Sequence, residues 1–95
     1  MTVASGFDAE QPWHLHPRVS LRIEPFGALA YHYENRRLSF LRAPELVTLL
    51  ESLGEHPSAR QAFTRSGIDR RRWPSFEGAL AALAESDVIT PGATS

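Results

Sequence analysis

With 95 residues and a formal net charge of −1, the chain is sized for one small domain and has no global field that attracts nucleic acid or anionic lipid. It contains no cysteine, which excludes iron–sulfur ligation, thiolate catalysis and disulfide bonds. No apolar run approaches the roughly 20 residues of a membrane helix, and the acidic N-terminus lacks a signal-peptide core. We therefore expect a soluble, cytoplasmic protein.

The chain ends carry little apolar patterning. The segment before Trp13 mixes glycine, serine and acidic side chains, which is typical of a flexible tail. In Trp13–His16 apolar side chains alternate with histidines, so this segment is predicted as a short extra strand or an extended lead-in. The predicted organisation is a flexible N-terminal tail over residues 1–12, one folded domain over 13–90 and a frayed C-terminus over 91–95.

Three short alternating segments then predict an antiparallel meander. Val19, Leu21 and Ile23 alternate with polar side chains, as in a strand with one solvent-facing side. Ala28–Tyr33 alternates small and large side chains, and Leu38–Leu41 is apolar. The pattern leaves open whether the small or the large side chains of the second strand face the core.

A polar turn separates the second and third predicted strands. It runs from Glu34 to Arg37 and contains Asn35, a residue type that tolerates the left-handed conformation a hairpin needs. The third strand has one evident partner, so its other edge would present a row of unpaired backbone groups. Such an edge beside a helix is suited to receive an extended peptide.

Three helices are predicted after the meander. Prolines 44, 57 and 74 are each placed in a first helical turn, where the missing N–H costs nothing, and Gly54 and Gly67 are placed where the first two helices stop. The predicted helices are Pro44–Leu53, Pro57–Ser66 and Pro74–Ser86. Their predicted inner faces are Leu46, Leu49, Leu50 and Leu53; Ala59, Ala62 and Phe63; and Phe76, Leu80 and Leu83. The predicted fold class is α+β and winged-helix-like, with a three-stranded antiparallel sheet followed by three helices.

Part of this sequence resembles a known family. The segments EPFGALAYHY and RRLSFLRAPEL, followed by EHPSAR, closely resemble the small peptide chaperones of mycofactocin biosynthesis, which are PqqD-like recognition elements of ribosomally made, modified peptides. The resemblance runs from about Trp13 to Ile89. It implies a non-catalytic peptide-recognition domain that binds a short precursor peptide and presents it to a radical S-adenosylmethionine enzyme. It also implies that the peptide lies between the last strand and the last helix.

The residues themselves indicate the same place. The strand Arg37–Arg42 would supply main-chain hydrogen bonds to a guest peptide, and its terminal arginines would pair with acidic guest residues. A flank of small residues on the third helix borders the core stripe, and we interpret it as a groove wall rather than as close helix packing. The predicted peptide-binding residues are Arg37, Leu38, Ser39, Phe40, Leu41, Arg42, Ser75, Ala79, Ala82, Leu83 and Ser86.

The sequence gives less support to metal binding and to catalysis. His14 and His16 have a His-x-His spacing and His32 is a conceivable third ligand, but no cysteine or evident carboxylate completes the set, so neither metal nor cofactor is predicted. Ser39 and His32 could be neighbours across the hairpin, but a sheet surface offers no oxyanion hole, so we predict no enzyme. An exposed edge can also pair with its own copy, which leaves both a monomer and a strand-swapped homodimer open.

The alternative function is a winged-helix DNA-binding regulator. A recognition helix offers Arg, Asn, Gln or Ser to base edges, whereas the third helix offers Glu77 and Glu85, which phosphates would repel. The basic run Arg70–Arg72 lies in the preceding loop. We therefore expect neither a nucleic-acid nor a membrane partner.

The first testable prediction is that the protein does not bind duplex DNA. Fluorescence anisotropy titrations with duplex DNA should show no salt-sensitive binding at low salt. Electrostatic binding to DNA would weaken steeply as the salt concentration rises. Tight, salt-sensitive binding that disappears when Arg70, Arg71 and Arg72 are replaced would instead support the regulator.

Overall fold

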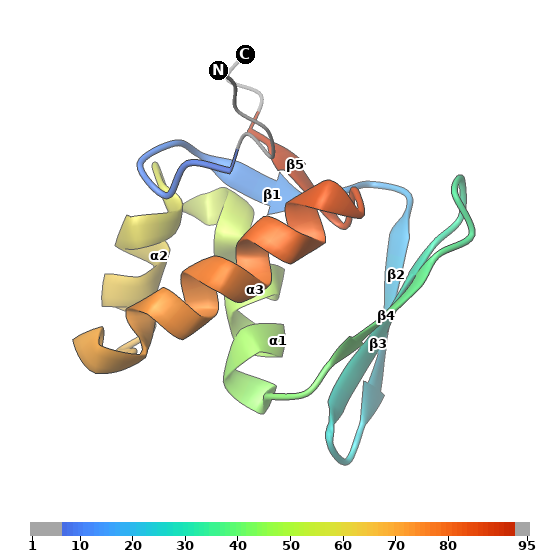
Figure 1. Cartoon of the computed structure of the whole chain (residues 1–95), viewed down its shortest axis with the longest axis horizontal. Helices are drawn as coiled ribbons and strands as arrows, with labels where there is room; N and C mark the ends of the chain where they lie inside the picture. Colours follow the sequence, from blue (N-terminus) through green and yellow to red (C-terminus); the bar gives the residue numbers. More distant parts are fainter. Residues whose placement is uncertain (1–6, 93–95) are drawn as a thin grey trace.

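The computed structural model describes residues 7–92. A twisted sheet of three strands stands to one side of the three helices, and a two-stranded ribbon crosses the other end of the helices (Figure 1). No helix in this part of the chain combines the length and apolar character needed to span a bilayer. The elements in chain order are β1 (Trp13–Leu15), β2 (Val19–Glu24), β3 (Gly27–His32), β4 (Leu38–Leu41), α1 (Pro44–Ser52), η1 (Leu53–Glu55), α2 (Ala59–Arg65), η2 (Arg70–Arg72), α3 (Trp73–Glu85) and β5 (Ile89–Pro91).

The predicted fold class, α+β with a three-stranded antiparallel sheet followed by three helices, is confirmed. The strand order is β2-β3-β4, and both pairs are antiparallel. The structure decides which side of β3 faces the core: Ala28, Ala30 and His32 are buried, and α1 packs against this side. Gly27 has a φ of +146°, and a Cβ there would lie 2.0 Å from the carbonyl oxygen of Leu41. Only glycine fits this approach of β4 to β3.

All ten predicted inner-face residues of the helices are buried. Phe63 lies at the centre of the helical core, with its ring centroid 5.5 Å from that of Trp73 and 6.2 Å from that of Phe76. Pro44 and Pro74 lie in the first turns of α1 and α3, as predicted. Gly67, with a φ of +73°, follows α2 in the predicted stop position.

The helix ends differ from prediction by one or two residues, and two of the residues predicted to mark them do not do so. Pro57 does not begin α2, because Ser58 is the N-cap and its side-chain oxygen accepts a hydrogen bond from the N–H of Gln61 (3.1 Å). Gly54 does not end α1, which stops at Ser52 and tightens into the 3₁₀ turn η1.

The segments flanking the domain contribute more structure than the sequence predicts. Strand β5 pairs with β1, with Leu15 opposite Ile89. The carbonyls of Ala9 and Gln11 accept hydrogen bonds from the first two N–H groups of α2, so residues 7–12 lie against that helix where a flexible tail was expected. The remainder of the predicted tail (1–6) and of the frayed end (93–95) lies outside the described residues.

The β3–β4 turn is organised by side chains. Arg36, with a φ of +63°, takes the left-handed conformation that the sequence assigns to Asn35. The Asn35 side chain instead accepts a hydrogen bond from the N–H of Arg37 (2.8 Å) and donates one to the carbonyl of Ser86 (3.2 Å), which ties the turn to the end of α3. His32 is 2% exposed, and its Nδ1 accepts a hydrogen bond from the N–H of Glu34 (3.1 Å).

Replacing His32 by leucine tests this turn. The substitution removes the acceptor for the Glu34 N–H in a partly buried turn, so we expect unfolding free energy to fall by about 1–3 kcal/mol. Urea denaturation measures the change. His14→Leu is the matched control, since the His14 imidazole makes no hydrogen bond within residues 7–92 and its loss should cost less. Equal stability of the His32 variant and the wild type would show that His32 does not hold the turn.

Candidate functional site

Strand β4 is hydrogen-bonded along one edge only. Its partner is β3, and no strand of the described part of the chain lies on its other side. The N–H of His32 donates to the carbonyl of Arg37 (3.0 Å), which identifies this pair as a hydrogen-bonded pair of the ladder. Hydrogen-bonded pairs recur at every second residue, so Ser39 and Leu41 point their backbone groups at β3. The N–H and C=O groups of Leu38 and Phe40 therefore point to the open edge.

The side chains of β4 are divided between the two sides of the sheet. Leu41 is buried in the core and Ser39 is half-buried on the same side, facing the helices. Leu38 and Phe40 lie on the opposite side, and each is about half exposed. The two residues with free backbone groups are thus also the two whose side chains point away from the helices.

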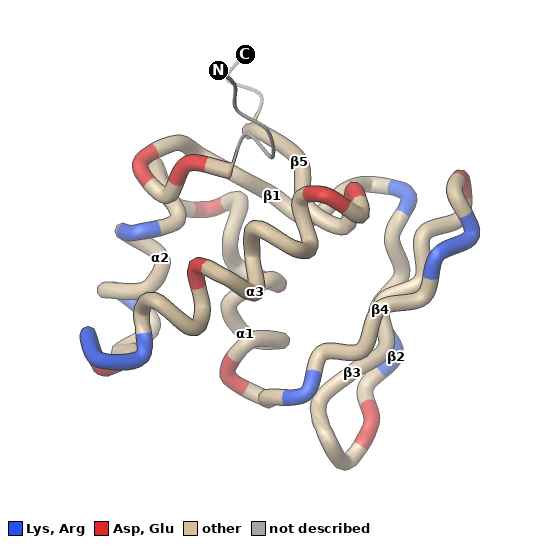
Figure 2. The backbone as a smooth tube through the Cα atoms, in the orientation of Figure 1, with Lys and Arg blue, Asp and Glu red and all other residues tan. Residues whose placement is uncertain are grey.

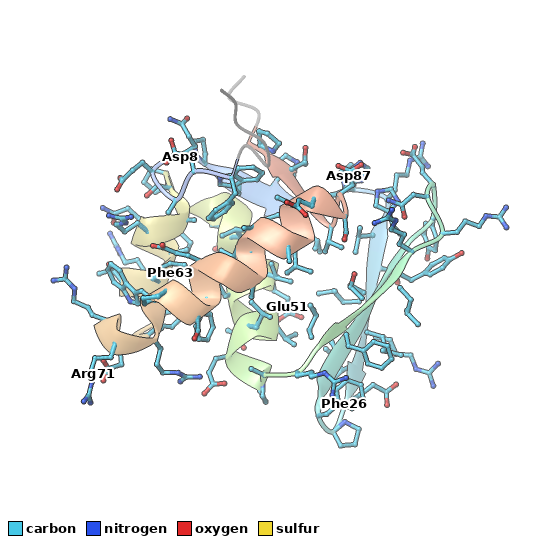
Figure 3. All side chains as sticks on the ribbon, in the orientation of Figure 1. Asp8, Phe26, Glu51, Phe63, Arg71 and Asp87 are labelled. Carbon is cyan, nitrogen blue, oxygen red and sulfur yellow. The ribbon has the colours of Figure 1, made fainter. Side chains whose placement is uncertain are left out.

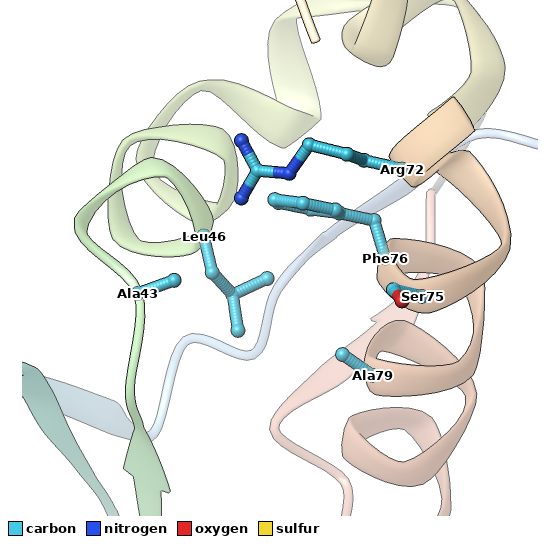
Figure 4. A pocket seen from close by; sticks show the side chains of 6 residues that line it. All are labelled: Ala43, Leu46, Arg72, Ser75, Phe76 and Ala79. Carbon is cyan, nitrogen blue, oxygen red and sulfur yellow. The ribbon is translucent and has the colours of Figure 1, made fainter. Parts of the chain in front are cut away.

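An apolar pocket lies just past the end of β4, between α1 and α3. Its volume is about 220 Å³, and Figure 4 shows Leu46 and Phe76 facing each other across it, with the Arg72 guanidinium beside the Phe76 ring. The volume suits one or two side chains rather than a whole ligand. The lining residues are Ala43, Leu46, Arg72, Ser75, Phe76 and Ala79.

One wall of the pocket is polar because of Arg72. Its guanidinium lies 5.1 Å from the Phe76 ring centroid and donates to a carboxylate oxygen of Glu45 (3.3 Å). A hydrogen bond from the main-chain N–H of Glu45, and next the Arg72 guanidinium, lower the pKa of the Glu45 carboxyl. Glu45 therefore stays ionised at neutral pH and holds Arg72 at the pocket.

The structure spreads the predicted residues of α3 along the helix. Ser75 and Ala79 line the pocket, whereas Ala82, one turn further, is exposed. Leu83 belongs to the core, and Ser86 is half-buried, with its carbonyl bonded to Asn35. None of these placements tests peptide binding, so the assignment of these residues and of Arg37–Arg42 stays a prediction.

Sequence reasoning missed part of the pocket lining. Leu46 and Phe76 were assigned to the core alone, and neither Ala43 nor Arg72 was assigned to the peptide site. A signal for Arg72 exists in the sequence, since it precedes Phe76 by four residues and such pairs share a helix face. Ala43 and Leu46 offered no such signal, because only the tertiary fold brings them to α3.

A second cluster lies beside the β3–β4 turn. His16, His32 and Glu34 each place one nitrogen or oxygen atom within 4.8 Å of the others, and the two imidazole centroids are 4.5 Å apart. His14 lies outside this cluster, since β1 ends at Leu15 and the two histidines of the His-x-His motif do not share a strand.

The hydrogen bonds of the His16 and His32 imidazoles argue against cation binding at this cluster. Nδ1 of His16 accepts from the N–H of Arg18 (2.9 Å), and Nδ1 of His32 accepts from that of Glu34. A neutral imidazole that accepts at Nδ1 carries its proton at Nε2, whereas a metal-binding histidine donates with the nitrogen that does not bind the metal. With the proton at Nε2, neither ring offers a free lone pair there, and Nε2 of His32 is buried without a hydrogen-bond partner among the described residues.

The chain is similar in sequence to known proteins over most of its length. The model of the peptide chaperone MftB family matches residues 12–90. The chain is 40% identical over 88 residues to "Peptide chaperone MftB" of Mycobacterium ulcerans, covering 93% of this chain and 81% of that protein. It is 41% identical over 86 residues to the protein of the same name from Mycolicibacterium smegmatis, covering 90% and 84%.

No solved structure matches the chain significantly. The family match spans most of the chain, including the open β4 edge and the pocket beside it. This protein belongs to the MftB family of peptide chaperones.

Proposed function

We propose that this protein binds a short ribosomal precursor peptide as an added strand on the open edge of β4 and delivers it to a radical S-adenosylmethionine enzyme of mycofactocin biosynthesis. The observation that carries the proposal is the unpaired backbone edge at Leu38 and Phe40, which ends beside an apolar pocket. Main-chain hydrogen bonds at the edge provide affinity, and the pocket provides side-chain selectivity.

The two ends of α3 define the extent of the proposed groove. At one end Asn35 joins the β3–β4 turn to Ser86, and at the other end Ser75 and Ala79 line the pocket next to Ala43. A guest strand on β4 would alternate its side chains between the two sides of the sheet. Side chains on the inner side would face α3, and the pocket would take an apolar one near the C-terminal end of β4.

Arg37 and Arg42 lie at the two ends of the edge. Both are exposed, and neither has a carboxylate within ion-pair distance in the described part of the chain. Acidic guest residues at the matching positions would add about 0.2–1 kcal/mol each, since exposed pairs are weak. These arginines would set guest register more than affinity.

We further propose that the protein works in the cytoplasm and has no catalytic role of its own. The relatives are named for a chaperone activity and not for a reaction. The chemistry on the guest would then belong to the modifying enzyme, and this protein would contribute binding and presentation.

Single proline substitutions along β4 test strand addition. Proline at Leu38 or Phe40 removes an N–H that points to the open edge, so peptide affinity should fall while the fold is largely kept. Proline at Ser39 or Leu41 removes an N–H that points to β3, so these two variants should disrupt the hairpin and lower the melting temperature. Calorimetric peptide titrations and circular dichroism melts of all four variants give the comparison. Normal folding and normal binding in all four would rule out strand addition at this edge.

Enlarging Ala79 tests the pocket. In Ala79→Phe the ring occupies the space between Leu46 and Phe76, so we expect at least tenfold weaker peptide binding with a melting temperature close to that of the wild type. Ala81→Phe is the matched control, because two residues along a helix turn the side chain about 200° away. A large drop in melting temperature for Ala79→Phe would indicate overpacking of the core, which typically costs about 1–3 kcal/mol, and would argue against a guest pocket.

A further inference from the structure

The side of the sheet that faces away from the helices carries an unusual number of large apolar side chains. Five of them are 36% to 59% exposed, and Leu29 is half-buried among them. Figure 3 shows side chains projecting from the sheet on the side away from the helices, with Phe26 at one end. We call this surface the outer face, and it consists of Phe26, Leu29, Tyr31, Tyr33, Leu38 and Phe40.

These side chains are ordered against one another. The rings of Phe26 and Phe40 are stacked with centroids 6.0 Å apart, and Tyr31 and Tyr33 meet edge to face at 5.5 Å. Leu29 lies opposite Phe40 across the β3–β4 ladder. Cross-strand and aromatic contacts of this kind fix rotamers before a partner arrives, which lowers the entropic cost of binding. Contiguous exposed apolar surface mostly marks an interaction site.

The border of the outer face is basic. Figure 2 shows arginines at both ends of the sheet. Arg42 lies 5.5 Å from the Phe40 ring centroid and, like Arg36, has no carboxylate partner within residues 7–92. The acidic residues at the two ends of the sheet are already paired, Glu24 with Arg22 (2.9 Å) and Glu34 with Arg18 (3.5 Å). A partner with an apolar patch bordered by carboxylates complements this surface.

The same charges argue against other occupants. A second copy of this chain would bring arginines against arginines across a two-fold axis, and like charges oppose that contact. Single-stranded nucleic acid is bound by rings on which successive bases stack, whereas the rings of the outer face are interrupted by aliphatic side chains, with Leu29 opposite Phe40 and Leu38 opposite Tyr31. Protein with an acidic border is the occupant that the surface favours.

The outer face is continuous with the proposed peptide edge. Leu38 and Phe40 present their side chains on the outer face and their free backbone groups at the edge of β4. A guest strand added there would extend the sheet, and every second guest side chain would lie beside those of Leu38 and Phe40. A protein that covers the outer face would therefore touch the guest as well.

We propose that the outer face is the docking surface for the enzyme that modifies the guest peptide, and that this enzyme meets it with an apolar patch bordered by carboxylates. The inference rests on the proposed function. It assigns the two sides of the sheet to different partners, with the guest between β4 and α3 and the enzyme on the outer face. The domain and the guest would then form one composite surface.

The test uses the double variant Phe26→Ser/Tyr33→Ser and the charge reversal Arg36→Glu at an arginine unpartnered within residues 7–92, none of which alters a predicted peptide-binding residue. Ile23→Ser is the apolar control, because Ile23 is an exposed residue of β2 whose side chain lies on the other side of the sheet. Arg71→Glu is the charge control on the far side of the helices (Figure 3). The probes are the short peptide and the radical S-adenosylmethionine enzyme encoded nearest to this gene, and each Kd is measured separately by calorimetry.

We expect the enzyme Kd, measured with peptide present, to rise at least tenfold in the double variant and in Arg36→Glu, with peptide Kd within twofold of the wild type. Both controls should bind enzyme and peptide normally. Unchanged enzyme binding in both test variants overturns the proposal. Two other results would also overturn the proposal. One is a wild-type dimer in sedimentation that the test variants dissociate, and the other is binding of single-stranded RNA that these variants abolish. Wild-type protein that binds the enzyme through this face but does not bind the peptide would sustain the docking surface and reject strand addition.

Discussion

Helix α1 lies directly against the sheet only because the inner side of β3 carries methyl groups at Ala28 and Ala30. Larger side chains there would force the helix and the sheet apart, as overpacking does in any close-packed core. The connection from β4 to α1 consists only of Arg42 and Ala43, so the position of α1 also fixes the direction of β4. The open edge and the pocket next to Ala43 both follow from this contact.

Sequence patterns predicted the parts of the fold that depend on local periodicity. The ten inner-face residues of the helices and the three strands of the meander were predictable because each lies in a segment with its own apolar repeat. The core-facing side of β3 was not, since its two sides differ in size more than in polarity and the packing of α1 decides between them. Strand β5 was missed because Ile89–Pro91 is too short for a repeat and pairs with a segment far away in the chain.

The candidate site, too, was predictable from the sequence only where its residues form a pattern within one segment. Ser75 and Ala79 were found because small residues recur on one side of α3, and the edge was found because β4 has one sequence neighbour able to pair with it. The pocket combines residues from the β4–α1 connection, α1, η2 and α3, and no pattern in one segment can reveal such a set. Arg36 replaces Asn35 as the left-handed residue because the Asn35 side chain is committed to Arg37 and Ser86.

The capping of α2 by the N-terminal segment bears on how the protein can be shortened. Ala9 and Gln11 supply acceptors for the first two N–H groups of a helix only seven residues long, and Arg60 of that helix also pairs with Glu10 (2.9 Å). A helix this short has little stability of its own and depends on its tertiary contacts. A protein trimmed to begin at Pro12, where the family match starts, would lose these acceptors and would loosen α2 on the side of the molecule opposite the sheet.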